Sequence, residues 1–183
     1  LGTKTFGLRS WGLPPYLPVA DAIDAAIAAG NGRARLSDLQ KDLPARFGHS
    51  SASVSIYASA ALRFQVQGGW VRHRPPEDYA SFAVDPEDDP HCFRDEKGRW
   101  ATDLEVGADL LRGSGLGVPE GFAGAVACGP GETLTTTDQF GAPVTLTWSD
   151  RNTSGPGISS VRLVAEAHGA VSGDRLRIAV DGD

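Results

Sequence analysis

The segment that most restricts how this chain can fold is residues 64–74, with the sequence FQVQGGWVRHR. Apolar and polar side chains alternate on both sides of Gly68-Gly69, which is the pattern of two half-buried strands. A Gly-Gly pair readily takes the positive φ angles of a tight two-residue turn. The segment is therefore predicted to form a β-hairpin.

Three helices and a short strand are predicted before this hairpin. The first helix lies within VADAIDAAIAAGNG, where Val19, Ile23, Ala26 and Ile27 share one face and the following glycines end the helix. RARL, which comes next, is a candidate for a short strand.

The second helix is expected within SDLQKDLPARFG. Ser37 is the expected N-cap, Leu36, Leu39 and Leu43 face inward, and Pro44 bends or shortens the helix.

The third helix is expected within SSASVSIYASAALR, with Ser50 or Ser51 as its N-cap. Its predicted buried stripe consists of Val54, Tyr57 or Ala58, Ala61 and Leu62. Helix, short strand, helix, helix and hairpin is the element order of a winged helix-turn-helix domain.

The second half of the chain predicts a small α+β domain. Strands are expected in RWATDLEV, ETLTTTD, APVTLTWS and DRLRIAVDG, and helices in PEGFAGAVACG and ISSVRLVAEAHGA, the latter capped by Ser159 or Ser160. The fold class is thus α+β throughout.

Four regions follow from this pattern. Residues 1–12 are interpreted as a remnant strand or linker from an upstream domain of a longer protein, and residues 13–76 as the winged helix-turn-helix. Residues 77–98 form an acidic connector, partly ordered by Tyr79, Phe82 and Phe93, and residues 99–183 the small α+β domain.

Charge is distributed unevenly along the chain. The net charge is −6, but residues 1–75 hold nine Lys and Arg against four Asp and Glu, whereas the other residues hold eight against nineteen. The first part is therefore +5 and the remainder −11, an asymmetry that indicates an anionic partner for the first part.

The predicted partner is double-stranded DNA, bound by the third helix in the major groove and by the hairpin on the backbone or in the minor groove. Arg72 and Arg74 alternate on one face of the second hairpin strand, with His73 on the other. The predicted DNA-binding residues are His49, Ser51, Ala52, Ser53, Ser55, Ile56, Ser59, Arg63, Gln67, Arg72, His73 and Arg74.

The third helix offers small hydroxyls and apolar groups rather than the side chains that make bidentate contacts to bases. Residues 50–62 contain no Arg, Lys, Asn or Gln. Ala52 and Ile56 suit the methyl group of thymine or of 5-methylcytosine, so methylated DNA is a candidate ligand. The alternative is close docking that is blind to sequence.

The segment SSASVSIYASAALRFQVQGGWVRHR resembles the third helix and wing of bacterial sigma-factor-like and HARE-type winged helices. TFGLRSWG, near the start of the chain, resembles the last wing strand of the same class and implies an upstream copy. The delta subunit of RNA polymerase belongs to this class, but the long acidic tail of that subunit is missing here.

The segment SSVRLVAEAHGAVSGDRLRIAV resembles, over about 25 residues, the pseudobarrel DNA-binding domains of B3-like and AbrB-like type. This resemblance implies a second contact surface. Its candidate residues are Arg151, Asn152, Arg162, Arg175 and Arg177. The alternative is that these are solvated surface cations of an acidic domain.

No catalytic or metal-binding constellation is recognised. Cys92, Cys128 and the four widely separated histidines do not have the spacing of a zinc site, and GSGLG lacks the lysine and the strand–loop–helix context of a phosphate-binding loop. We therefore expect no enzyme activity, no cofactor and no metal.

No apolar run approaches the roughly 18 residues that span a bilayer, and two cysteines make no disulfide framework. A cytoplasmic location without membrane contact is expected. The function predicted from the sequence is non-catalytic DNA binding within a larger regulator or a defence or restriction factor. The alternative is a protein-interaction module, for example one that contacts RNA polymerase.

Overall fold

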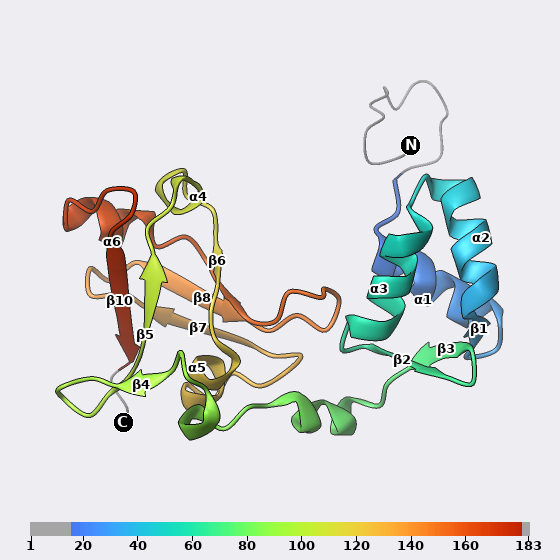
Figure 1. Cartoon of the computed structure of the whole chain (residues 1–183), viewed down its shortest axis with the longest axis horizontal. Coiled ribbons are helices and arrows are strands. Elements are labelled where there is room, and N and C mark those ends of the chain that lie inside the picture. Colours follow the sequence, from blue (N-terminus) through green and yellow to red (C-terminus); the bar gives the residue numbers. More distant parts are fainter. Residues whose placement is uncertain (1–15, 181–183) are drawn as a thin grey trace. The chain divides into compact units, whose positions relative to one another are not determined.

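The computed structural model describes residues 16–180 and divides the chain into two compact units (Figure 1). The first unit ends at Pro76 and takes in Arg151–Thr153, and the second holds Glu77–Asp150 and Ser154 onward. The expected remnant in residues 1–12 lies outside the described residues. The α+β class is confirmed, since both units combine helices with small antiparallel sheets.

The first unit consists of three helices and a three-stranded antiparallel sheet. In chain order its elements are α1 (Val19–Ala29), β1 (Ala34–Arg35), α2 (Leu36–Phe47), α3 (Ser51–Ala60), β2 (Phe64–Gln67) and β3 (Trp70–His73). The strand order is β1-β3-β2, so that the short strand before α2 pairs with the second strand of the hairpin.

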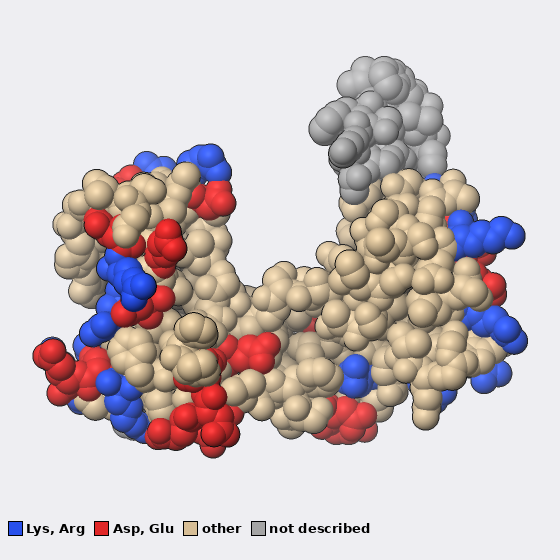
Figure 2. All heavy atoms as spheres, in the orientation of Figure 1, with Lys and Arg blue, Asp and Glu red and all other residues tan. Residues whose placement is uncertain are grey.

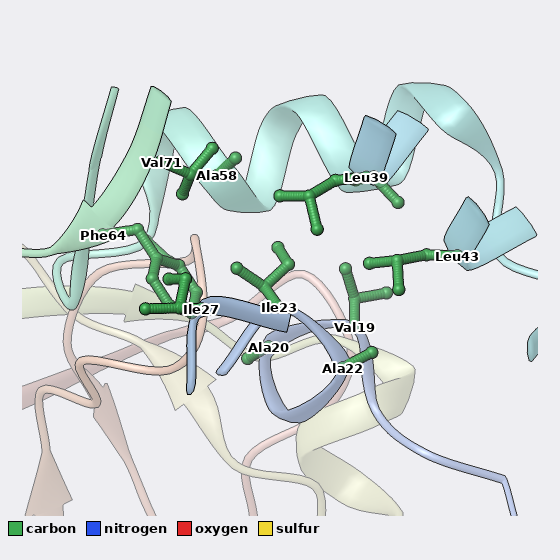
Figure 3. Packing of buried hydrophobic residues seen from close by; sticks show 12 residues of the cluster. Val19, Ala20, Ala22, Ile23, Ile27, Leu39, Leu43, Ala58, Phe64 and Val71 are labelled. Atoms are coloured by element: carbon green, nitrogen blue, oxygen red, sulfur yellow. The ribbon is translucent and has the colours of Figure 1, made fainter. Parts of the chain in front are cut away.

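The core of the first unit lies between the three helices and the inner face of this sheet. Figure 3 shows Ile23 and Ile27 of α1 pointing toward Leu39 of α2, Phe64 of β2 and Val71 of β3. The buried stripe predicted for α3 is confirmed, with Tyr57 half-buried beside it. Its members within the helix are Val54 and Ala58, which are buried, whereas Ala61 and Leu62 are buried but follow the end of α3 at Ala60.

The start of α3 is fixed by the N-cap expected from the sequence. The hydroxyl of Ser50 accepts a hydrogen bond of 2.9 Å from the backbone N–H of Ser53, which satisfies one of the free donors in the first turn.

The start of α2 differs from the prediction that Ser37 is its N-cap. The helix begins at Leu36 after Arg35, and no side chain caps it. The N–H of Leu36 instead donates to the carbonyl of Gly69 in the hairpin turn, at 3.0 Å. A tertiary hydrogen bond thus replaces the local cap. Pro44 lies inside α2, which runs on to Phe47, so it does not end the helix.

The hairpin predicted around Gly68-Gly69 is confirmed. Gln67 pairs with Trp70 across a two-residue turn, and both glycines have positive φ angles, +57° and +77°. These are the conformations of a type I′ turn, whose twist matches the strands on either side.

The second unit contains two small antiparallel sheets. The first has the order β10-β5-β4 and the second β6-β9-β8-β7. The strands are β4 (Phe93–Arg94), β5 (Trp100–Glu105), β6 (Leu116–Gly117), β7 (Thr133–Thr137), β8 (Pro143–Thr147), β9 (Gly157–Ile158) and β10 (Arg175–Val180). The helices are η2 (Pro76–Phe82), η3 (Pro86–Asp88), α4 (Ala108–Leu111), α5 (Glu120–Ala125) and α6 (Arg162–Ala167).

The four strands predicted for this half correspond to β5, β7, β8 and β10, and the two predicted helices to α5 and α6. The N-cap residue of α6 is Val161, but the Ser160 hydroxyl accepts a hydrogen bond of 3.3 Å from the N–H of Arg162, the first residue of the helix. Ser159 is engaged elsewhere, because its hydroxyl accepts a hydrogen bond of 2.9 Å from the N–H of Thr145 in β8.

The acidic stretch after Pro76 is packed into the second unit. Asp89 accepts a hydrogen bond of 2.8 Å from the N–H of Gly121 at the start of α5. Asp95 closes the turn before β5 by accepting from the N–H groups of Lys97 and Arg99, each at 2.9 Å. The Arg99 guanidinium, which hydrogen-bonds the Asp95 carboxylate, lowers the pKa of this group from 3.8 to about 2.

Within residues 16–180, no helix is both long enough and apolar enough to cross a membrane.

Candidate nucleic-acid interface

The outer face of α3 is uncharged and made of small side chains. Ser51, Ala52 and Ser59 are exposed, and Ile56 is 54% exposed. Figure 2 shows the visible side of α3 without charged atoms. This surface permits close approach of a partner and offers apolar contact through Ile56.

The α3 hydroxyls are largely engaged with their own helix. Ser55 donates to the carbonyl of Ser51 and Ser59 to the carbonyl of Ser55, both at 2.9 Å. Gln40 of α2 donates to the Ser55 hydroxyl at 2.7 Å, and Ser53 contacts the capping Ser50 hydroxyl at 2.7 Å. Toward a ligand, these serines therefore present chiefly their remaining oxygen lone pairs.

His49, predicted as a contact residue, lies inside the fold just before α3. It is 6% exposed and packs against the rings of Tyr16 and Phe47, with centroid distances of 5.7 and 5.9 Å. Its Nε2 atom is buried without a hydrogen-bond partner. The structure thus separates His49 from the exposed α3 residues.

Arg63 and His73 converge on one carboxylate of α1. Arg63 Nη1 lies 2.5 Å from Asp24 Oδ2, and His73 Nε2 lies 2.9 Å from Asp24 Oδ1. His73 also stacks on Phe64 at a centroid distance of 5.9 Å. Asp24 therefore joins the segment after α3 and strand β3 to α1, and it offsets positive charge that the sequence alone assigns to the surface.

Arg74 is also held by the fold. Its Nε donates to the carbonyl of Leu62 and its Nη2 to the carbonyl of Phe64, both at 2.8 Å. The guanidinium thus satisfies backbone acceptors at the start of β2, where the chain turns from α3 into the hairpin.

Arg72 and Gln67 lie on the outer face of the sheet. Gln65 pairs with Arg72 and Gln67 with Trp70, so these four side chains share the face opposite Phe64 and Val71. Arg72 is half-buried, and its Nε is enclosed without a hydrogen-bond partner.

Two further cations lie on this outer face and were not among the DNA-binding residues predicted from the sequence. Arg35 of β1 pairs in register with Trp70, and its Cζ lies 4.9 Å from the centre of the Trp70 ring. Arg33 Cζ lies 4.4 Å from the same ring. The alternation Arg33-Ala34-Arg35 was the available signal, since two cations at a spacing of two residues in a strand share a face.

The charged groups of the first unit are unevenly placed. Residues 43–76, which include α3 and the hairpin, contain no Asp or Glu, whereas α2 carries Asp38 and Asp42. Lys and Arg atoms gather on the right-hand side of this unit in Figure 2, over α2 and β1. The side of α3 in this view is uncharged.

The candidate second surface is made of cations that are mostly beside carboxylates. Arg162 pairs with Glu166 at 2.7 Å, Arg177 with Asp103 at 2.7 Å, and Arg175 lies opposite Glu105 in the β10–β5 register. Hydrogen bonding to Arg177 lowers the pKa of Asp103. Arg151 and Asn152 are on the loop between β8 and β9, and Arg151 Nη1 lies 3.4 Å from Asp21 Oδ1.

Within the described range, no group of three or more His, Cys, Asp or Glu side chains is placed to hold a metal ion. Cys92 and Cys128 are free and buried, and desolvation by burial raises the pKa of both thiols.

No protein-family model matches the chain, and no curated protein or solved structure matches it either.

Proposed function

We propose that the first unit is a winged helix-turn-helix domain that binds double-stranded DNA through the outer face of α3 and the β2–β3 hairpin. The element order α1-β1-α2-α3-β2-β3 and the strand order β1-β3-β2 support this interpretation. The observation that carries it is the absence of carboxylates from residues 43–76, while cations border the same elements. A surface that approaches phosphates must avoid uncompensated negative charge.

In this proposal α3 fits the groove by shape and apolar contact. Ile56 and Ala52 are placed to meet a methyl group at the 5-position of a pyrimidine, and burying one such carbon is worth about 0.8 kcal/mol. A preference for 5-methylcytosine over cytosine is therefore a few-fold per methyl group. Close docking that is blind to sequence predicts no such preference.

The same proposal covers the kind of protein to which the chain belongs and the role of the second unit. The resemblance of the sequence of α3 and the hairpin to sigma-factor-like and HARE-type winged helices supports the proposal that the chain is part of a bacterial DNA-binding protein, either a regulator or a defence or restriction factor. The second unit, as a pseudobarrel-like domain, then adds a weaker contact, since most of its candidate cations lie beside carboxylates.

The proposal is tested by electrophoretic mobility shift with the whole chain and duplexes of random sequence. Ile56→Glu places a carboxylate on the outer face of α3 and is expected to weaken binding at least about tenfold, because like charges at an interface cost several kcal/mol. Leu163→Glu is the matched control, because Leu163 is a 65% exposed apolar residue on α6 of the second unit.

Circular dichroism spectra first verify that both variants fold. Loss of binding in Ile56→Glu with retention in Leu163→Glu supports the proposal. Equal binding by both variants places the site away from α3. Absence of any shift by the unchanged protein at low salt contradicts DNA binding and favours a protein-interaction module, for which the exposed Ile56 is the apolar contact.

A further inference from the structure

The tip of the hairpin carries a cluster in which two arginines lie against one tryptophan. We call Arg33, Arg35 and Trp70 the Trp70 cluster. The Cζ atoms of Arg33 and Arg35 lie 4.4 and 4.9 Å from the ring centre, within the range of cation–π attraction. Pairing of β1 with β3 and the bond from Leu36 N–H to the Gly69 carbonyl fix the backbone around it.

The two guanidinium groups of the cluster are available to an anion. Both arginines are exposed, and no carboxylate among the described residues pairs with either. In contrast, Arg63 is paired with Asp24, and Arg74 donates to backbone carbonyls. Arg63 and Arg74, which both follow α3 in the sequence, are thus already engaged, while the two arginines of the Trp70 cluster have no carboxylate partner.

Contact with an aromatic ring leaves the donors of a guanidinium group unused. Arginine has five N–H donors at the edge of its plane, and a ring beside the group accepts none of them in a conventional hydrogen bond. A phosphate oxygen can therefore be bound while the ring contact persists. The ring also restricts two long side chains before binding, which lowers the entropy that ordering them costs.

Because α3 carries no charged side chain, DNA binding by the first unit requires cations outside this helix. Residues 50–62 contain no charged side chain, so α3 itself cannot neutralise phosphates. The electrostatic part of DNA affinity has to come from cations elsewhere in the unit. Beyond the Trp70 cluster, the outer face of the sheet adds Arg72, which alternates with Val71 and so shares the side of Trp70.

We propose that the Trp70 cluster is the phosphate-binding element of the first unit, with Arg33 and Arg35 each contacting a backbone phosphate of duplex DNA and Trp70 positioning both. The ligand is the phosphodiester backbone, so the contact carries no sequence preference. This inference rests on the proposed function, but it assigns the backbone contact to residues at β1 and the hairpin turn rather than to Arg63 or Arg74.

The test measures the affinity of the whole chain for a fluorescent duplex of random sequence by anisotropy over a salt series. In the double variant Arg33→Gln/Arg35→Gln, the slope of log K against log salt is expected to become shallower by roughly two. The control Arg94→Gln/Arg112→Gln removes the same charge from the second unit. It also removes an arginine that lies over a tryptophan, since Arg94 Cζ is 4.1 Å from the Trp100 ring. Its slope is expected to stay unchanged.

Variants of Trp70 test whether the ring positions Arg33 and Arg35, because they leave the charge of both arginines unchanged. Trp70→Leu keeps both cations, so the slope should stay the same while the affinity falls about fivefold. Trp70→Phe keeps an aromatic face and should retain most of the affinity. Circular dichroism melting curves of all variants report on folding, and the double arginine variant replaces only exposed side chains.

The possible results lead to different conclusions. A shallower slope in the Arg33/Arg35 variant alone, with rescue of the Trp70→Leu defect by phenylalanine, supports the inference. DNA binding with an unchanged slope in the Arg33/Arg35 variant overturns it and leaves the proposed function in place. An equal loss of slope in the Arg94/Arg112 control shows a diffuse charge effect and overturns it as well. If the unchanged protein does not bind DNA, both proposals fail.

Discussion

Replacing Asp24 tests how much its pairs with Arg63 and His73 contribute to the stability of the first unit. Its carboxylate lies 2.5 Å from Arg63 Nη1 and 2.9 Å from His73 Nε2, and it connects α1 to the segment after α3 and to β3. Asp24→Asn keeps the shape of the side chain and removes its charge. The substitution therefore tests the charge rather than the packing.

The expected loss of stability in Asp24→Asn depends on how exposed Asp24 and its two partners are. Converting a charge-assisted hydrogen bond to a neutral one costs about 1 kcal/mol. The side chains of Asp24, Arg63 and His73 are 24%, 20% and 53% exposed, so solvent screening reduces the contribution of each pair. We expect a total loss of about 1 kcal/mol, which lowers the Tm of so small a unit by roughly 4 to 8 °C.

The assay is thermal unfolding followed by far-UV circular dichroism at fixed pH and salt. Asp42→Asn is the matched control, because Asp42 is an exposed aspartate on α2 without a hydrogen bond or ion pair in the described part of the chain. Both variants change the net charge equally. Equal Tm values for the two variants would show that the Asp24 pairs contribute nothing to stability and would refute the reasoning.

Three further predictions concern caps, turns and acid. Ser50→Ala should destabilise the protein by about 1 kcal/mol through loss of the α3 N-cap, and an unchanged urea midpoint would contradict that role. Gly68→Val should lower the free energy of unfolding by about 1–2 kcal/mol because φ is +57° at this position. Gly68→Asn should lower it much less, and equal losses for the two variants in denaturant titrations would argue against the I′ turn. Because the pKa of Asp95 is about 2 when folded and 3.8 ordinarily, its stabilisation is complete above about pH 4 and lost as the pH falls toward 2. Asp95→Asn should therefore flatten the dependence of Tm on pH in that window. A curve parallel to that of the unchanged protein would show that ionised Asp95 does not stabilise the fold.

Local patterns predicted most of the first unit. The apolar spacing of α1 and α3, the Ser50 cap and the Gly68-Gly69 turn are each encoded within a few adjacent residues, and all of them are confirmed. The strands β5, β7, β8 and β10 were likewise visible as alternating runs.

Predictions failed where a distant contact replaced a local one. Ser37 has the residue type of an N-cap, but α2 begins earlier because the Leu36 N–H is bonded to Gly69 in the hairpin turn. Ser159 does not cap α6 because its hydroxyl is bonded to Thr145 in β8. Such partners lie many residues away, and a sequence pattern does not show them.

The same limit applies to the candidate interface. Counting charges along the chain cannot show that Arg63 is offset by Asp24, nor that Arg74 binds backbone carbonyls. The neighbourhood of Trp70 depends on the pairing of β1 with β3, which joins residues far apart in the sequence. Sequence alone therefore indicated a cationic unit, and the structure identifies which cations are engaged and which are exposed.

The most direct test of DNA binding by the first unit is the salt dependence of affinity for the unchanged whole chain. If the first unit binds DNA, log K for duplexes of random sequence falls linearly as log salt rises, with a slope of about −0.9 for each phosphate neutralised. Contacts by Arg33, Arg35 and Arg72 give a slope near −3 by the same rule. No measurable binding at low salt, or an affinity independent of salt, would contradict DNA binding by the first unit.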